Sequence, residues 1–225
     1  MVAENLKRVT DRITKACERS ERPVSSVFLV CVTKEAALEA IAEALSLGVT
    51  AIGENRVRDA LTKYRSVGNK AVWHLIGHLQ TNKVKDALKI FSLIHSVDSI
   101  RLAQEIDKEA SKLDKVQDIL IQVNVSGEGT KFGIRPEDTI EFFKTLLLYP
   151  NINVRGFMTI APDSDDPEKA RPYFRALKQL LDQINNLQLT AYSLQLLSMG
   201  MTNDFEVAIE EGSTMVRIGR AIFGE

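Results

Sequence analysis

Short apolar segments alternate with longer amphipathic segments along almost the whole chain. Eight of the short segments are rich in Val and Ile, and several are apolar at consecutive positions, as strands buried on both faces must be. These segments are 27–33, 49–54, 72–77, 92–98, 118–126, 153–161, 192–200 and 215–224. We therefore predict eight strands.

Helical spacing of apolar residues accounts for the rest of the pattern. The spacing from Leu6 to Cys17 predicts an amphipathic helix ahead of the first strand. Further helices are predicted within 35–48, 101–113, 136–150 and 166–187. Gly48 fits the C-terminal end of the second helix. Asp166 and Pro167 fit the start of the last one, although Pro172 can shift that start to a later residue.

This order of elements favours one architecture over another. Strands that alternate with helices, without a linker rich in Pro, Gly or Ser, predict a (β/α)8 barrel. It is an α/β fold in a single domain over residues 1–225, with an extra N-terminal helix. The alternative is an open doubly wound sheet. No G-x-G-x-x-G motif follows a predicted strand, so the usual support for a dinucleotide-binding sheet is missing.

Composition narrows the classes of partner. The chain has 29 basic and 30 acidic side chains, so its net charge of −1 gives no reason to expect nucleic acid or an anionic membrane. No apolar run approaches the roughly 20 residues of a membrane span, and the first residues lack the apolar core of a secretory signal. Cys17 and Cys31 have no metal-type spacing and suit a reducing compartment. We expect a cytoplasmic protein.

Lys34 is the first candidate for chemistry. Functional residues of such barrels lie at the C-terminal ends of the strands, and Lys34 follows the apolar run that ends at Thr33. One interpretation is a side chain that extends from the strand end into solvent. The other is a desolvated amine with a lowered pKa, which can attack a carbonyl to form a Schiff base.

The ends of the seventh and eighth strands offer an anion site. Ser198 supplies a hydroxyl, while Gly200 and Gly219 allow close approach to backbone N–H groups. Arg217 and Arg220 add positive charge. Closure of the barrel makes the first and eighth strands neighbours. An aldehyde joined to a phosphate would bridge Lys34 and this site, and pyridoxal 5′-phosphate (PLP) is such a molecule.

Sequence motifs in the same order point to a known family. They are "VTK" (32–34), "GENRV" (53–57), "WHLIGHLQTNK" (73–83), "HSVDS" (95–99), "VNVSGEGTKFGI" (123–134), "RGFMTI" (155–160) and "LSMGMTNDFEVAIEEGSTMVRIGRAIFG" (197–224). Through them, the sequence resembles the pyridoxal phosphate homeostasis proteins, or YggS/PROSC/PipY family. The resemblance implies a fold-type III PLP protein, a barrel similar to the N-terminal domain of bacterial alanine racemase.

The resemblance also implies roles for individual residues. PLP would be held as an internal aldimine on Lys34. The phosphate would lie on Ser198, Gly219 and the backbone of Arg220, with Gly200 nearby. Relatives often carry a small hydroxyl residue at position 220, so no role is assigned to the Arg220 side chain. The PLP ring would lie near Asn55 and Met158, with Arg217 facing the pyridine nitrogen. The implied partners are PLP and PLP-requiring apoenzymes, and the implied state is a monomer.

Two functions fit such a site: a PLP carrier in vitamin B6 homeostasis, or a PLP-dependent amino-acid racemase. Arginine opposite the pyridine nitrogen weakens PLP as an electron sink. Barrel racemases pair their lysine with a tyrosine base from an added domain, whereas this chain stops at Glu225. The tyrosines are expected on helices or at strand starts, and they are Tyr64, Tyr149, Tyr173 and Tyr192. We expect a carrier, because two-base racemisation lacks its second base.

Three other residues keep alternatives open. His74 and His78 are favoured as structural residues, with catalysis as the other interpretation. Lys131, in the loop 126–133, is either an exposed loop lysine or a second amine that transfers PLP. The first of these is favoured for Lys131.

Overall fold

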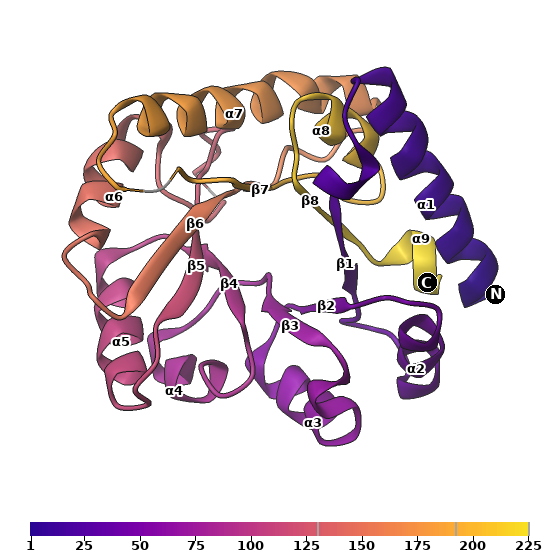
Figure 1. Cartoon of the computed structure of the whole chain (residues 1–225), viewed down its shortest axis with the longest axis horizontal. Helices are drawn as coiled ribbons and strands as arrows, with labels where there is room; N and C mark the ends of the chain where they lie inside the picture. The colour runs from indigo at the N-terminus through magenta and orange to yellow at the C-terminus, as the bar shows by residue number, and fades with distance from the viewer. Residues whose placement is uncertain (130, 192, 225) are drawn as a thin grey trace.

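The computed structural model describes residues 1–129, 131–191 and 193–224, and in them eight parallel strands close into a barrel (Figure 1). The strands are β1 (Phe28–Val32), β2 (Ala51–Glu54), β3 (Val72–Leu75), β4 (Leu93–Val97), β5 (Gln117–Gln122), β6 (Ile152–Met158), β7 (Leu196–Ser198) and β8 (Met215–Ile218). They follow chain order around the barrel, and β1 pairs with β8. The predicted barrel is confirmed over the open sheet.

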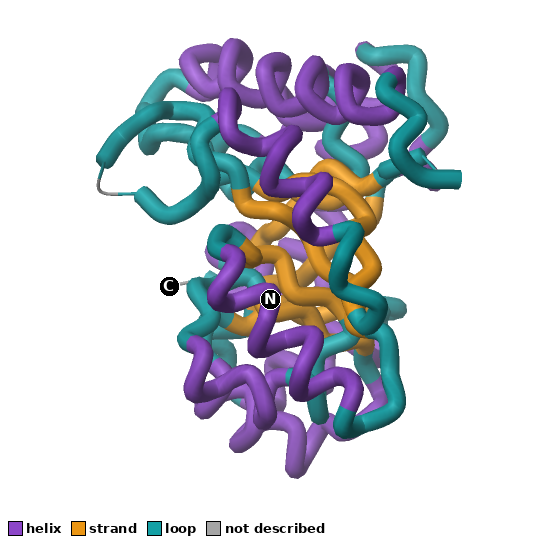
Figure 2. Tube along the Cα trace, turned by 90° about the vertical axis from the view of Figure 1, so that its left-hand side faces the viewer, coloured by secondary structure: helices purple, strands orange, loops and turns teal. Residues whose placement is uncertain are grey.

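Helices surround the strands, which occupy the middle of the molecule in the side view of Figure 2. The α-helices are α1 (Val2–Arg19), α2 (Leu38–Ser46), α3 (Val57–Val67), α4 (Val84–Ala87), α5 (Ile100–Ser111), α6 (Thr139–Leu146), α7 (Arg171–Asn186), α8 (Phe205–Glu210) and α9 (Arg220–Phe223). Short 3-10 turns are η1 (Val24–Ser26), η2 (Gly68–Lys70), η3 (Thr81–Lys83), η4 (Pro136–Asp138) and η5 (Pro167–Ala170).

The predicted boundaries at the C-terminus needed the largest correction. The segment 215–224 was predicted as one strand, but β8 ends at Ile218 and Arg220–Phe223 forms the helix α9. Isoleucines at 218 and 222 are both buried, which fits a turn of helix as well as a strand pattern. The carbonyl of Ile222 accepts a hydrogen bond from Asn5 Nδ2 at 3.0 Å, so α9 lies against α1. The first and last helices therefore lie side by side (Figure 1).

Several helix boundaries agree with the signals in the sequence. Gly48 has φ of +94° just after the C-cap of α2, a conformation that glycine adopts without strain. The Asp166 side chain accepts from the N–H of Glu168 at 3.0 Å and caps η5. The regular helix α7 starts only at Arg171, which places Pro172 in its first turn, where proline is tolerated. The predicted strand 192–200 shortens to Leu196–Ser198, and Tyr192 lies outside the described residues.

The two cysteines and the apolar character of the helices bear on the expectations from composition. Cys17 and Cys31 are buried free thiols, and burial raises the pKa of Cys31 to about 12. Within the three described ranges, we find no helix with enough length and apolar character to cross a membrane.

An ion-pair network joins α1, α7 and α8 on the outside of the barrel. Arg171 donates to Glu210 at 2.7 Å and Glu211 at 2.9 Å, and also to Glu168 one turn earlier. Glu210 additionally pairs with Arg19 at 2.7 Å. The three carboxylates raise the pKa of Arg171 above its usual value. The network thus anchors α1 and α7 to the short helix that precedes β8.

We predict that Arg171→Met lowers the free energy of unfolding by about 2 kcal/mol, because several pairs with half-buried carboxylates are lost together. Urea unfolding measures the change. The matched control is Lys144→Met, which removes one exposed pair with Glu141 and should cost less than about 0.5 kcal/mol. Equal losses in the two variants would contradict a cooperative network.

Candidate functional site

The barrel brings the predicted site residues to one part of its carboxyl rim. They lie near or after the ends of five consecutive strands, β6, β7, β8, β1 and β2, and they are Lys34, Asn55, Met158, Ser198, Gly200, Arg217, Gly219 and Arg220. The register fixes their order, because Met158 pairs with Ser198, Cys31 with Ile218, and Val32 with Gly53. Lys34 and Gly219 therefore follow adjacent strands, as barrel closure predicted.

Lys34 lies two residues beyond β1, in a turn closed by a hydrogen bond from Ala36 N–H to Thr33 O of 3.0 Å. Its side chain is 47% exposed, and the nearest carboxylate oxygen is Glu35 Oε1 at 3.7 Å. Of the two interpretations of Lys34, the desolvated amine does not describe this structure, since the strand ends before Lys34 and leaves its side chain half-exposed. The alternative prediction, a side chain that extends from the strand end, describes it, and such an amine is accessible to a ligand.

Arg217 points into the barrel rather than toward solvent. One guanidinium nitrogen donates to Ser198 Oγ at 2.6 Å, and the other donates to Thr159 O at 2.9 Å. Burial lowers the pKa of Arg217 to about 10, and the negative charge of Asp204 partly offsets this effect. The guanidinium therefore stays charged at neutral pH and is held in a fixed orientation between β6, β7 and β8.

A chain of hydrogen-bonded, buried polar side chains continues from Arg217 through the barrel. Ser198 Oγ lies 2.9 Å from His95 Nδ1, and His95 Nε2 lies 3.0 Å from His74 Nδ1. Burial lowers the pKa of His74 to about 4 and that of His95 well below its usual value, so both rings are neutral at pH 7. His74 also stacks against Phe28, the first residue of β1, with ring centroids 6.1 Å apart.

The Ser198 hydroxyl lies between two partners. Arg217 can only donate, so the hydroxyl accepts from Arg217. The direction of its contact with His95 Nδ1, and of the contact between the two histidines, depends on the tautomers of the rings. A serine hydroxyl has two lone pairs, so Ser198 can accept from both neighbours and still donate its proton to a phosphate.

His78 and His74 do not form a pair. His74 is buried inside the barrel, whereas His78 lies past β3 on the rim, with Nδ1 4.0 Å from Asp98 Oδ2. The ring of Phe132 stacks on His78 at 4.1 Å between centroids, so the segment after β5 covers this part of the rim. Lys131 pairs with Glu128 at 3.0 Å within the same loop, in which Thr130 lies outside the described residues.

Close backbone packing explains the two glycines. A Cβ on Gly219 would lie 2.9 Å from Val32 O, so the end of β8 approaches the end of β1 more closely than a side chain allows. Gly200 has φ of +93°, and a Cβ there would lie 2.6 Å from Ala208 Cβ in α8. Gly219 directly precedes α9, whose first N–H groups have no partner within the helix.

The remaining predicted residues differ in depth. Met158 is fully buried in an inner cluster with Val30, Leu93, Leu120 and Met215, which forms the floor below the rim. Asn55 is exposed at the end of β2, and its backbone carbonyl packs against Gly77. Arg220 is exposed at the start of α9.

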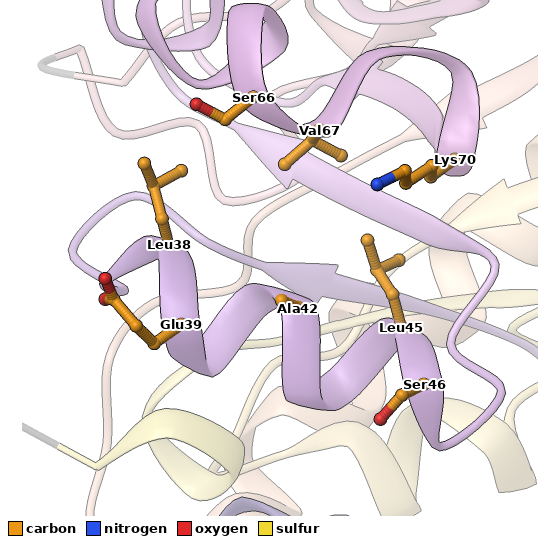
Figure 3. A pocket seen from close by; sticks show the side chains of 8 residues that line it. All are labelled: Leu38, Glu39, Ala42, Leu45, Ser46, Ser66, Val67 and Lys70. Atoms are coloured by element: carbon orange, nitrogen blue, oxygen red, sulfur yellow. The ribbon is translucent and has the colours of Figure 1, made fainter.

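Two grooves lie elsewhere on the molecule. A groove of about 570 Å³ between α2 and the end of α3 is lined by Leu38, Glu39, Ala42, Leu45, Ser46, Ser66, Val67 and Lys70 (Figure 3). A second groove of about 420 Å³ is lined by Ser25, Ser26, Phe28, Gln195, Leu196, Thr214 and Met215, at the amino ends of the strands. Neither contains a predicted site residue, so the carboxyl rim remains the candidate site.

Comparison with known proteins agrees with this geometry. The family model "Alanine racemase, N-terminal domain" matches residues 5–225. A pyridoxal phosphate homeostasis protein of Aquifex aeolicus (strain VF5) is 49% identical over 225 residues, which cover 99% of this chain and 97% of the relative. The chain belongs to the pyridoxal phosphate homeostasis protein family. The resemblance seen in the sequence motifs is therefore confirmed.

Solved structures of other proteins share this fold. The structure of PipY from Synechococcus elongatus PCC7942 with PLP bound is 32% identical, matches 100% of both chains and has a TM-score of 0.86. An alanine racemase from Clostridium difficile 630 matches 99% of this chain and 57% of its own length, with 17% identity and a TM-score of 0.75. That second likeness concerns the fold alone, and it confirms an alanine racemase-like barrel.

Four residues of this family member were not singled out from the sequence, although they contact the candidate site. His95 and Thr159 belong to the hydrogen-bonded chain around Arg217, and Glu54 and Lys63 contact the segment before Lys34. His95 lies two residues after the inward-facing Leu93 on β4, and this spacing on one strand face is a signal for the barrel interior. Glu54 and Lys63 come from separate elements, so no local spacing links them.

Proposed function

We propose that this chain binds PLP at the carboxyl rim of the barrel and serves PLP homeostasis without turning over a substrate. The observation that carries the proposal is the half-exposed Lys34 amine just after β1, beside the strand β8 that holds the buried Arg217 and leads to Gly219. The names of its relatives and the PLP-bound PipY structure support it. We propose residues 1–225 as one PLP-binding domain.

The residues present fit the parts of PLP. Lys34 supplies an amine that can form a Schiff base with an aldehyde. The backbone approach between Gly219 and Val32 leaves no room for a side chain, which suits a phosphate held by backbone N–H groups of Gly219 and Arg220, with Gly200 nearby. We propose that the Ser198 hydroxyl, which accepts from Arg217, also donates to the phosphate. When bound, PLP would supply an electron-withdrawing aldehyde and ring.

Arg217 would set the electronic state of the ring. Its pKa of about 10 leaves the guanidinium charged at neutral pH, so it can donate a hydrogen bond to the pyridine nitrogen without protonating it. Two hydrogen bonds, to Ser198 and Thr159, keep it in place. We propose that Met158 forms the floor beneath the ring and that Asn55 lies at its edge.

A carrier is favoured because the described tyrosines lie away from Lys34. Tyr64 belongs to α3, Tyr173 belongs to α7, and Tyr149 follows α6, while Tyr192 lies outside the described residues. His74 is buried within the barrel. These positions offer no second base on the far side of a ligand bound to Lys34. His78 beside Asp98 is the rim group that favours the alternative, a racemase.

The experiment is an absorption spectrum of the purified protein with PLP, followed by a chiral product assay with L- and D-amino acids. We predict a Schiff-base band near the visible range and no inverted amino acid. Steady inversion of one amino acid that is lost in His78→Gln would contradict the carrier and support the racemase. Absence of the band with free PLP in excess would contradict PLP binding through Lys34.

We further propose that PLP-requiring apoenzymes receive the cofactor from a monomer of this chain in the cytoplasm. The two free, buried thiols fit a reducing compartment. Mixing the PLP-loaded protein with an apoenzyme in the presence of a PLP trap tests direct transfer. Recovery of apoenzyme activity despite the trap is expected, and recovery that the trap abolishes would contradict direct delivery.

A further inference from the structure

A buried carboxylate lies beside the turn that carries Lys34. Glu54 ends β2 and is fully buried, and its Oε1 accepts from the Thr33 hydroxyl at 2.6 Å and from the Lys63 ammonium at 2.7 Å. Its second oxygen, Oε2, is buried and has no hydrogen-bond partner among the described residues. The contacts of this carboxylate thus rely on Thr33 and Lys63 together.

The same lysine also holds the backbone of the turn. Lys63 Nζ donates to Thr33 O, the carbonyl that accepts from Ala36 N–H across the turn. Thr33 N–H in turn donates to Gly53 O at 3.0 Å. Thr33 is therefore fixed through its N–H, its carbonyl and its hydroxyl, and Lys34 is the next residue. Within the described ranges, the ion-pair partner of the Lys34 amine is the Glu35 carboxylate, at 3.7 Å.

Burial of the Glu54–Lys63 ion pair has an unusually high cost in free energy. A fully buried carboxylate and a lysine must give up their hydration, and apolar residues of similar size often serve stability as well or better. The contacts converge on one turn, and they leave the amine of that turn free. A set of polar groups that rigidifies the residue before a reactive amine preorganises it for a ligand.

We propose that Thr33, Glu54 and Lys63 form a clasp that positions the Lys34 amine for the aldehyde of PLP. This rests on the proposed function, in which Lys34 forms the covalent link. Thr33, Glu54 and Lys63 are positioning residues, because they act through the backbone of the turn and do not touch the ligand. The clasp predicts that aldehyde capture depends on the Thr33 hydroxyl while phosphate binding does not.

The test is a double-mutant cycle with PLP as the probe. Thr33→Val keeps the branched shape and removes the hydroxyl, and Thr33→Ser restores it. In the protein with Lys34, we expect Thr33→Val to raise the Kd for PLP by about tenfold and Thr33→Ser to restore it. In the Lys34→Ala background, Thr33→Val should change the residual Kd by less than about twofold. Thr139→Val, a buried threonine on α6 that bonds to Arg135 O, is the matched control and should leave the Kd unchanged.

Hydrogen exchange of the Ala36 amide, measured without PLP, separates failure of the clasp from failure of the proposed function. Faster exchange in Thr33→Val and in Lys63→Met/Glu54→Gln, with none in Thr139→Val, is expected. Unchanged exchange would overturn the clasp whatever PLP does. Equal effects of Thr33→Val on Kd in both backgrounds would also overturn it, since a merely structural role weakens all binding. Faster exchange in these variants, together with a wild-type protein that forms no Schiff base, would reject the proposed function and, with it, the role of the clasp in aldehyde capture.

Discussion

Lys34→Ala is expected to remove the Schiff-base absorption band completely and to weaken PLP binding roughly 100-fold, on the order of 3 kcal/mol. The phosphate contacts near Gly219 should leave a residual, non-covalent affinity. Because the Lys34 side chain is half-exposed and lies in a turn, its removal should change the free energy of unfolding by less than about 0.5 kcal/mol. Absorbance titration with PLP and urea unfolding measure the two effects.

The control for this prediction is Lys131→Ala. Lys131 pairs with Glu128 in the loop after β5, and its loss should leave the band in place. An unchanged band in Lys34→Ala would contradict the assignment of Lys34. Loss of the band in Lys131→Ala alone would make Lys131 the amine that carries PLP.

Acid is expected to destabilise the PLP-free protein by about 4 kcal/mol between pH 7 and pH 5, through His74 and His95. Burial holds the folded pKa of His74 at about 4 and that of His95 well below its usual range, whereas an unfolded histidine has a pKa of about 6.5. The unfolded chain therefore binds protons that the folded chain does not. Stability is fully present above about pH 6.5 and is lost as the pH falls, by about 2 kcal/mol per histidine.

Urea unfolding at several pH values measures this dependence. His95→Gln and His74→Gln should each reduce the loss by about 2 kcal/mol, while Ile94→Val, a buried neighbour that does not titrate, should keep it. Burial raises the pKa of Asp98 and Asp204, which favours the folded state as pH falls and opposes the effect of the histidines. The difference between variants, and not the total loss of stability, therefore measures the histidine contribution. The same loss in all three variants would show that the buried histidines are not its source.

The number and order of the strands could be predicted from the sequence because they follow from local periodicity, whereas several exact strand ends could not. Eight apolar segments with helices between them lead to a closed barrel, and closure alone makes β1 and β8 neighbours. That reasoning correctly placed Lys34 and Gly219 after adjacent strands. It left two interpretations of Lys34 open, exposed or desolvated, because it did not show that β1 ends two residues before Lys34.

Depth within the barrel could not be predicted in the same way. His74 and His78 are four residues apart in one motif, yet one is inside the barrel and the other is on the rim. The sequence also did not show that the hydroxyl of Ser198, which is expected at a phosphate, contacts His95, a residue 103 positions away. Side-chain partners of this kind depend on which residues of distant strands share a layer, and no spacing in the sequence records that.

Reduction of the PLP-loaded protein with borohydride, followed by peptide mapping in a mass spectrometer, tests the central claim most directly. Reduction fixes the bond between the cofactor and whichever lysine holds it. The account predicts a single modified residue, Lys34. Modification of another lysine, or no modification while PLP stays bound, would contradict it.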